Sequence, residues 1–194
     1  MDAHRTSRDR LPEALVEFYG LAPLSQEGGR FRQTWAGPAR PDGRPEGTAI
    51  VMLLTAEPGD FSALHRLPTD EIWHFYTGDP LTLFLLSEGG GRGEGGGLSQ
   101  GGGPSQGGGL AEGGAGRART VVLGPDVLGG QHVQFTVPAG TWMAAEVADG
   151  GAWTLFGCTM APGFTFEDYE HGDAAELAAR FPQEAARITA LSRP

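Results

Sequence analysis

Hydrophobic and polar positions divide this chain into three parts. In the first part, Leu11, Leu15 and Phe18 recur at the spacing of one helical face and predict a short amphipathic helix, after a flexible tail over residues 1–10. Residues 31–160 change to short runs rich in β-branched and aromatic side chains, broken every few positions by Gly, Pro or Asp. After them the pattern becomes helical again.

The middle part contains about eight such runs, which are typical of β-strands. Because no helical segment separates them, they predict an antiparallel sandwich or barrel, and therefore a mainly β fold. In chain order the runs are "FRQTW", "TAIVMLL", "EIWHFYTG", "LTLFLLS", "RTVVLG", "HVQFTVPAG", "TWMAAEV" and "WTLFGCTM".

The last part, "DAAELAARFPQEAARITAL", predicts two short helices. Asp173 and Glu176 match the pattern of a capping box at the start of the first helix, and Pro182 separates it from the second. We expect these helices to pack on the outside of the barrel or to bridge a dimer.

Residues 89–116 are dominated by glycine and repeat the related phrases "GGGLSQ", "GGGPSQ" and "GGGLAE". Such a segment buries too little apolar area to offset its chain entropy, so it predicts a disordered loop inserted between two strands. It is not a phosphate-binding loop, because that motif needs a lysine and the chain has none. Residues 11–194, with this insertion, fit a single domain.

The charge of the chain narrows the choice of partners. A formal net charge of −10 without any lysine argues against nucleic acid and anionic membranes, since both bind basic surfaces. A neutral or cationic small molecule fits better. Cys158 is the single cysteine, so no intrachain disulfide can form, and no apolar run approaches the roughly 20 residues needed to span a bilayer. The polar N-terminal "MDAHRTSRDR" lacks the apolar segment of a secretory signal, and we therefore expect a cytoplasmic protein.

The stretch "FSALHRLPTDEIWHFYTGDP" carries the densest group of chemically active side chains. The spacing from Gly59 to His65, Leu67, Glu71 and Gly78 resembles the first cupin motif, G-x5-H-x-H-x3,4-E-x6-G. Every landmark is present except the second histidine, whose position is taken by Leu67.

The second cupin motif, P-x-G-x2-H-x3-N, resembles "PAGTWMAAEV". Pro138 and Gly140 match it, while Met143 stands at the histidine position and Val147 at the asparagine position. More closely still, the chain resembles the DUF985 (cupin-5) family of the RmlC-like cupin superfamily, in the phrases "EGGRFRQTW", "GTAIVMLLT", "HRLPTDEIWHFYTGDPL", "VVLGPDVLGGQHVQFTVPAGTW" and "GCTMAPGFTFEDYE". The resemblance implies a double-stranded β-helix, or jelly roll, with a ligand pocket at one mouth of the barrel, usually as a homodimer.

The resemblance also raises the question of a metal. Cupin metal sites use three histidines and one carboxylate, of which this chain keeps His65 and Glu71 and replaces the others by Leu67 and Met143. Two protein ligands rarely hold a first-row divalent ion tightly, and methionine sulfur prefers Cu(I). His74 is no substitute, because strand alternation turns it to the face opposite Glu71 unless a bulge intervenes. We therefore expect no cofactor; a divalent metal, if present, would bind His65 and Glu71.

Without a metal, His65 and Glu71 can form an acid–base pair in a partly apolar pocket. A histidine oriented by a carboxylate is a common device for moving a proton to or from carbon or oxygen. Trp73, Leu67 and Met143 would line this pocket, with Trp73 offering a flat wall to a ring or hydrophobic ligand. The equally open alternative is that His65 and Glu71 only satisfy each other in a barrel that binds a metabolite.

Arg32 and Gln134 lie in predicted strands, where each would either contact a carboxylate or hydroxyl of a ligand or link neighbouring strands. Cys158 lies in an apolar strand and is expected to be an inert core residue. The leading hypothesis is a dimeric jelly-roll protein that binds a small organic metabolite and catalyses its isomerisation, epimerisation or cyclisation. The alternatives are a non-catalytic sensor or carrier and a metal-dependent oxygenase with an irregular ligand set.

Overall fold

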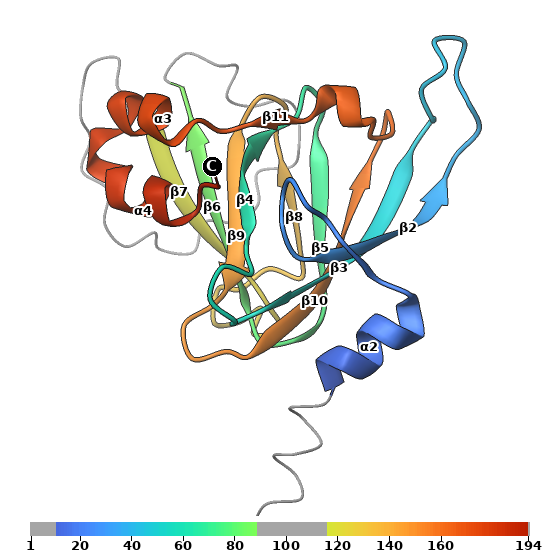
Figure 1. The fold of residues 1–194 in the computed structure, drawn as a ribbon, viewed down its shortest axis with the longest axis horizontal. Helices are drawn as coiled ribbons and strands as arrows, with labels where there is room; N and C mark the ends of the chain where they lie inside the picture. The colour runs from blue at the N-terminus through green and yellow to red at the C-terminus, as the bar shows by residue number, and fades with distance from the viewer. Residues whose placement is uncertain (1–10, 89–115, 194) are drawn as a thin grey trace, which may run out of the picture.

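The computed structural model describes residues 11–88 and 116–193, which form two antiparallel sheets packed face to face (Figure 1). The predicted tail over residues 1–10 and nearly all of the predicted glycine-rich loop lie outside the described residues. The first sheet consists, side by side, of β1 (Ala22–Pro23), β2 (Arg30–Ala36), β3 (Thr48–Thr55), β10 (Trp153–Met160), β5 (Glu71–Gly78) and β8 (Gln134–Val137). The second consists of β11 (Glu170–His171), β4 (Ser62–Arg66), β9 (Trp142–Val147), β6 (Leu81–Ser87) and β7 (Arg117–Leu123).

This architecture is the mainly β jelly roll that the sequence predicts. Each of the eight predicted runs forms a strand, β2, β3 and β5 to β10. Because successive side chains of a strand point to opposite faces, every second residue of these runs enters the space between the sheets. The resulting core draws residues from both sheets, among them Met52, Trp73, Leu83, Met143 and Phe156. The remaining strands, β1, β4 and β11, are not predicted.

Two helices cover the outer face of the second sheet. They are α3 (Ala174–Arg180) and α4 (Ala185–Ala190), joined by the 3₁₀ turn η2 (Pro182–Glu184). The predicted cap is present, since the Asp173 carboxylate accepts a hydrogen bond from the Glu176 backbone N–H at 2.7 Å. The buried contact with the sheet comprises Leu177, Phe181, Ile188 and Leu191 on the helical side and Leu64, Phe84, Leu86 and Trp142 on the strands. The helices therefore pack on the outside of the barrel, as expected.

Helix α2 (Leu11–Tyr19) lies against the outer face of the first sheet. Its contacts with the sheet come from Leu15, Val16 and Tyr19. The helix itself is confirmed, but the predicted buried face is wrong in part, because Phe18 is 79% exposed. Among the described residues, no helix combines the length and apolarity needed to cross a membrane.

Candidate functional site

The site is built around His65, whose ring lies inside the barrel near the end of β4. His65 is 2% exposed and lies opposite Met143 of the neighbouring strand β9. Its Nδ1 lies 2.8 Å from the carbonyl oxygen of Ala63. Because a carbonyl oxygen only accepts, Nδ1 carries the proton and donates it, which leaves Nε2 as the basic nitrogen of the neutral ring. Nε2 has no hydrogen-bond partner among the residues that the structure describes.

Glu71 is the second buried titratable group of the site. It begins β5 and accepts a hydrogen bond from Trp73 Nε1 at 2.8 Å. Burial raises the pKa of Glu71 from 4.5 to about 7; His65 and hydrogen bonds from Trp73 and Cys158 oppose this change, whereas the charge of Glu27 adds to it. Glu71 is therefore present both as an acid and as a carboxylate near neutral pH.

Trp73 and Cys158 are the side chains that donate hydrogen bonds to this carboxyl group. The Trp73 ring stacks on Phe156 with centroids 5.1 Å apart and planes 5° from parallel, which fixes the indole nitrogen toward Glu71. Burial raises the pKa of the Cys158 thiol, with a further contribution from the charge of Glu71. The thiol therefore stays neutral and serves as a hydrogen-bond donor, in keeping with the inert role predicted for it.

Glu27 enters the site from the tight loop between β1 and β2. Its Oε1 accepts a hydrogen bond from the Ser62 hydroxyl at 2.5 Å, and its carbonyl oxygen accepts one from the Ala63 N–H at 2.8 Å. The loop can approach β4 this closely because Gly28 has φ 109° and no side chain; a Cβ there would lie 2.2 Å from the Phe61 carbonyl oxygen. Glu27 thus adds a second negative group beside Glu71.

Tyr169 covers His65 from outside the barrel. Its ring lies nearly parallel to the imidazole, with centroids 5.2 Å apart and 19° between planes. Tyr169 follows the 3₁₀ turn η1 (Phe166–Asp168) and precedes β11, in a segment that runs across the top of the barrel in Figure 1. Its hydroxyl lies 3.1 Å from His171 Nδ1. Since His171 Nε2 faces the Arg193 carbonyl oxygen at 3.2 Å and must donate to it, Nδ1 accepts from the tyrosine.

The structure brings together five of the predicted site residues. His65 and Glu71 interact electrostatically, and Leu67, Trp73 and Met143 lie together in the buried core that surrounds them. The site is therefore largely apolar, with few polar groups converging in it, as small-molecule sites commonly are.

Arg32 and Gln134, the other predicted ligand contacts, lie outside the site. Both are exposed, because strand alternation sends their neighbours Phe31 and Phe135 into the barrel and turns the two polar side chains outward. Arg32 Nη1 donates to the Tyr19 carbonyl oxygen at 3.1 Å, so this arginine links helix α2 to the sheet.

The residues present do not fit the divalent-metal centre that the cupin resemblance implies. His74 faces away from the barrel, where its Nε2 lies 3.0 Å from the Thr159 hydroxyl. The irregularity in the pairing of β5 with β10 falls beyond His74 and does not turn it inward. Within residues 11–88 and 116–193, no group of three or more His, Cys, Asp or Glu side chains is placed to hold a metal ion.

The chain matches the family described as "Cupin superfamily (DUF985)" over residues 13–172. Protein SO0799 from Shewanella oneidensis has a similar structure, with a TM-score of 0.72 and 30% identity, over 94% of this chain and 97% of that one. A hypothetical protein from Leishmania major is similar at a TM-score of 0.72 and 28% identity, over 94% of this chain and 98% of that one. No curated protein matches.

Glu27 and Tyr169 are the site residues that the sequence did not predict. Both lie in phrases on which the family resemblance rests, "EGGRFRQTW" and "GCTMAPGFTFEDYE". That position in a shared phrase was the available signal, but neither residue occupies a cupin motif position.

Proposed function

This chain belongs to the DUF985 family of the cupin superfamily, and from that premise we propose that it binds a small organic molecule at the covered end of its barrel and transfers protons on it without a metal. One observation carries the proposal. His65 and Glu71 lie buried in one apolar site, the first with an unpartnered basic nitrogen among the described residues and the second with a pKa of about 7. A base and an acid are therefore both available near neutral pH.

The chemistry follows from these two groups. His65 Nε2 takes a proton from a carbon or hydroxyl of the ligand, and protonated Glu71 gives one to a second atom, so the product is an isomer and no electron is gained or lost. The imidazolium and carboxylate formed in this step attract each other in a site that Trp73 and Met143 shield from water. Return of the proton from His65 to Glu71 completes the cycle.

Exchange of ligand hydrogen with solvent tests this function before the product is known. Candidate ring-bearing, neutral or cationic metabolites that raise the melting temperature are incubated with the protein in D₂O, and their mass is followed. We expect deuterium to enter the ligand with wild-type protein and at least about a hundredfold more slowly with His65→Asn. Asn keeps a donor for the Ala63 carbonyl oxygen but lacks Nε2.

Two controls belong to this experiment. His132→Asn changes a histidine outside the site and should exchange at the wild-type rate. Dialysis against a chelator should leave the rate of deuterium exchange unchanged. Loss of exchange after dialysis would contradict a metal-free reaction. Wild-type exchange rates in His65→Asn would refute the role of His65.

A non-catalytic sensor or carrier is the second candidate, favoured by the electrostatic interaction through which His65 and Glu71 can simply satisfy each other. Trp73 and Phe156 stack side by side on neighbouring strands of the first sheet, and Tyr169 stacks on the His65 ring. A carrier would bind the ligand and return it without deuterium. The oxygenase reading receives no support from the ligand set, because Leu67 and Met143 stand where two histidines would be needed.

We also propose that the protein works as a homodimer in the cytoplasm. Two large exposed aromatic side chains of the first sheet, Trp35 on β2 and Tyr76 on β5, support an association surface on that sheet. Sedimentation equilibrium decides the oligomeric state. The cytoplasmic location stays a prediction from the sequence.

A further inference from the structure

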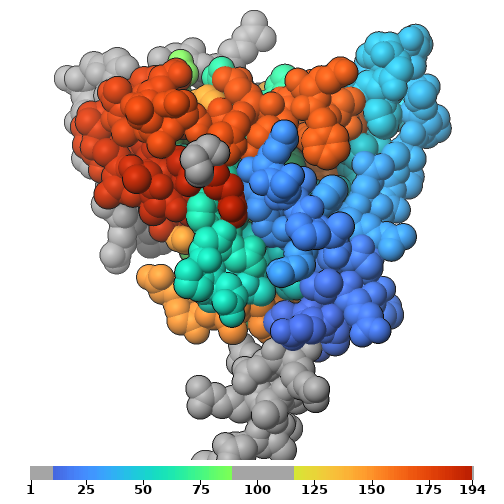
Figure 2. All heavy atoms as spheres, viewed as in Figure 1, coloured from blue at the N-terminus to red at the C-terminus, as the bar shows by residue number. Residues whose placement is uncertain are grey.

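One face of the His65 ring is covered by a single side chain in this structure. The Tyr169 ring lies over the imidazole, and His65 is almost completely buried beneath it. A molecule that is to approach the imidazole from this face must displace the tyrosine ring. Tyr169 in turn belongs to residues 165–171, which run over the barrel between two anchored ends. In Figure 2 these orange residues cross the top of the molecule between the red C-terminal helices and the light-blue hairpin that joins β2 to β3.

The two ends of this segment are fixed to the barrel by hydrogen bonds that backbone N–H groups donate. At the first end, the Phe164 N–H donates to the Thr48 hydroxyl at 2.9 Å, and the Phe164 ring packs on the barrel core. At the second end, the Gly172 N–H donates to the Leu64 carbonyl oxygen at 2.8 Å. Between them lie only the short turn η1 and the two-residue strand β11. We call residues 165–171 the strap.

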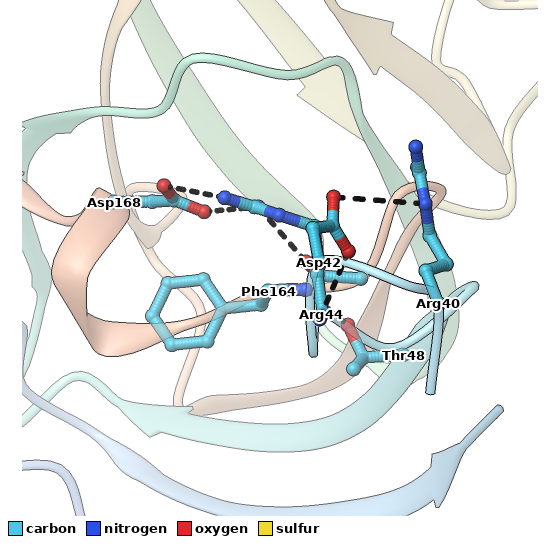
Figure 3. Close-up of polar contacts among 7 residues, drawn as sticks. Arg40, Asp42, Arg44, Thr48, Phe164 and Asp168 are labelled. Atoms are coloured by element: carbon cyan, nitrogen blue, oxygen red, sulfur yellow. Dashed lines mark hydrogen bonds and ion pairs between the residues drawn. The ribbon is translucent and has the colours of Figure 1, made fainter. Parts of the chain in front are cut away.

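The middle of the strap is held by ion pairs. Figure 3 shows the Arg44 guanidinium reaching from the β2–β3 hairpin to Asp168, where Nη2 donates to Oδ1 at 2.9 Å and Nη1 donates to Oδ2. The same Nη1 bonds the Gly163 carbonyl oxygen at 3.2 Å. Closer to the C-terminal end, Arg66 makes two hydrogen bonds to Glu170, at 2.6 and 2.8 Å.

We propose that the strap is a gate over the His65 site, with Tyr169 as the side chain that closes it and the Arg44–Asp168 ion pair as the clamp that keeps it closed. The proposal rests on the proposed function in one respect, since it takes His65 to be the group that a ligand must reach. Its test measures access to His65 and needs no substrate.

Three features favour a gate over a fixed cover. The clamp is polar, so water can replace its hydrogen bonds when the strap lifts, whereas an apolar cover would lose buried area. A hollow of about 480 Å³, lined by residues 42–44 and 165–167, lies directly beside the clamp and gives water access to it. Phe166, the large apolar residue of the turn, is 63% exposed and packs edge-to-face on the Phe164 ring at the first end of the strap.

The test follows the reaction of diethyl pyrocarbonate with His65, which modifies an unprotonated imidazole nitrogen and is read at each histidine by peptide mass spectrometry. Arg44→Gln removes the clamp charge, and we expect it to speed the modification of His65 about tenfold. The matched control is Arg40→Gln, because Arg40 lies in the same hairpin but faces Asp42 at 3.9 Å and makes no contact with the strap. His132 in the same sample serves as the internal rate standard.

Tyr169→Ala removes the closing side chain itself. It should speed the modification of His65 at least as much as Arg44→Gln does. The double variant Arg44→Gln/Tyr169→Ala should react no faster than Tyr169→Ala, because a clamp has no effect on access once the ring is gone. Additive effects would overturn the proposal.

A reversible disulfide distinguishes motion of the strap from static exposure of His65. Arg66 and Glu170 are directly opposed on β4 and β11, so Arg66→Cys/Glu170→Cys can form a disulfide that ties the strap down, while the native Cys158 is buried away from it. We expect His65 to react about tenfold more slowly in the oxidised than in the reduced form of this variant. Equal rates in the two forms, or wild-type rates in Arg44→Gln, would refute the gate without bearing on whether His65 transfers protons.

Discussion

The two ends of the barrel differ in what they leave open and what they bury. At one end, the loops over residues 55–61 and 146–151 line an open hollow of about 360 Å³. At the other end, His65 lies under Tyr169 of the strap, and Glu71 is buried in the same site. The buried proton-active groups therefore lie at the end of the barrel opposite to this hollow.

Carboxylates are present at both ends, but in different surroundings. In the open hollow, Asp60 accepts hydrogen bonds from the Thr55 N–H and hydroxyl at 3.0 and 2.5 Å, and Glu146 pairs with Arg187 at 2.5 Å. These partners and the nearby water compensate the charges. At the covered end, burial raises the pKa of Glu71 to about 7. The candidate site is therefore recognised by a carboxyl group that is removed from water, and not by the size of a hollow.

The largest effect on the free energy of unfolding is expected at the covered end, from removal of the Trp73 side chain that packs beside Glu71. Trp73→Ala removes a fully buried side chain and the donor to Glu71, and it should lower the free energy of unfolding by about 3–5 kcal/mol. Trp35→Ala is the control, since Trp35 is half-exposed and should cost less than about 1 kcal/mol. Urea unfolding measures both. Equal losses would mean that the covered end is no better packed than the surface.

The pH dependence of the free energy of unfolding also distinguishes the two ends, because it depends on the buried Glu71. In the folded protein the pKa of Glu71 rises from 4.5 to about 7, so between these values the folded state holds a proton that the unfolded state releases. The stability associated with Glu71 is therefore full below pH 4.5, falls as pH rises through this window and is lost above pH 7. The total loss is roughly 3 kcal/mol.

Glu71→Gln removes this titration, so its stability relative to the wild type should increase as pH rises. Urea unfolding from about pH 5 to about pH 8 measures the slope for both proteins. The control is Glu57→Gln in the open hollow, where the side chain is exposed and the wild-type slope should be retained. Parallel curves for wild type and Glu71→Gln would show that burial does not perturb this carboxyl group.

The smallest effects are expected at the open end. Asp60→Asn weakens two hydrogen bonds to Thr55 and should cost about 1 kcal/mol, whereas Glu146→Gln breaks a partly exposed ion pair and should cost less than about 0.5 kcal/mol. Neither should alter deuterium exchange into a ligand. A loss of exchange in either variant would place the reaction at the open end instead.

Strand prediction succeeded where a run is rich in β-branched and aromatic residues, and it failed at β4, because "SALHR" contains none of them. Ser62, Ala63, Leu64 and His65 are all buried, because Leu64 packs under the C-terminal helices while His65 faces the barrel. A strand covered on both sides shows no alternation of apolar and polar residues. His65 was found through the spacing of a motif and not through the pattern of its strand.

The remaining errors, at Arg32 and Gln134, concern the face of the sheet to which a side chain points. In β5, the motif fixes Glu71 as an inward residue, and alternation then correctly places Trp73 inside and His74 outside. No motif fixes the phase of β2 or β8, so Arg32 and Gln134 could not be assigned to a face before the sheet was known.

The sequence by itself determined the eight strands rich in β-branched and aromatic residues, the capped C-terminal helix and the grouping of His65 with Glu71, because these depend on local composition and on short motif spacing. Only the tertiary structure decided that Glu27 and Tyr169 join His65, because each reaches the site through contacts with residues far away in the chain. It also decided the state of Glu71, since a pKa depends on the depth of burial and on neighbouring charges, which exist only once the two sheets have closed over the carboxyl group.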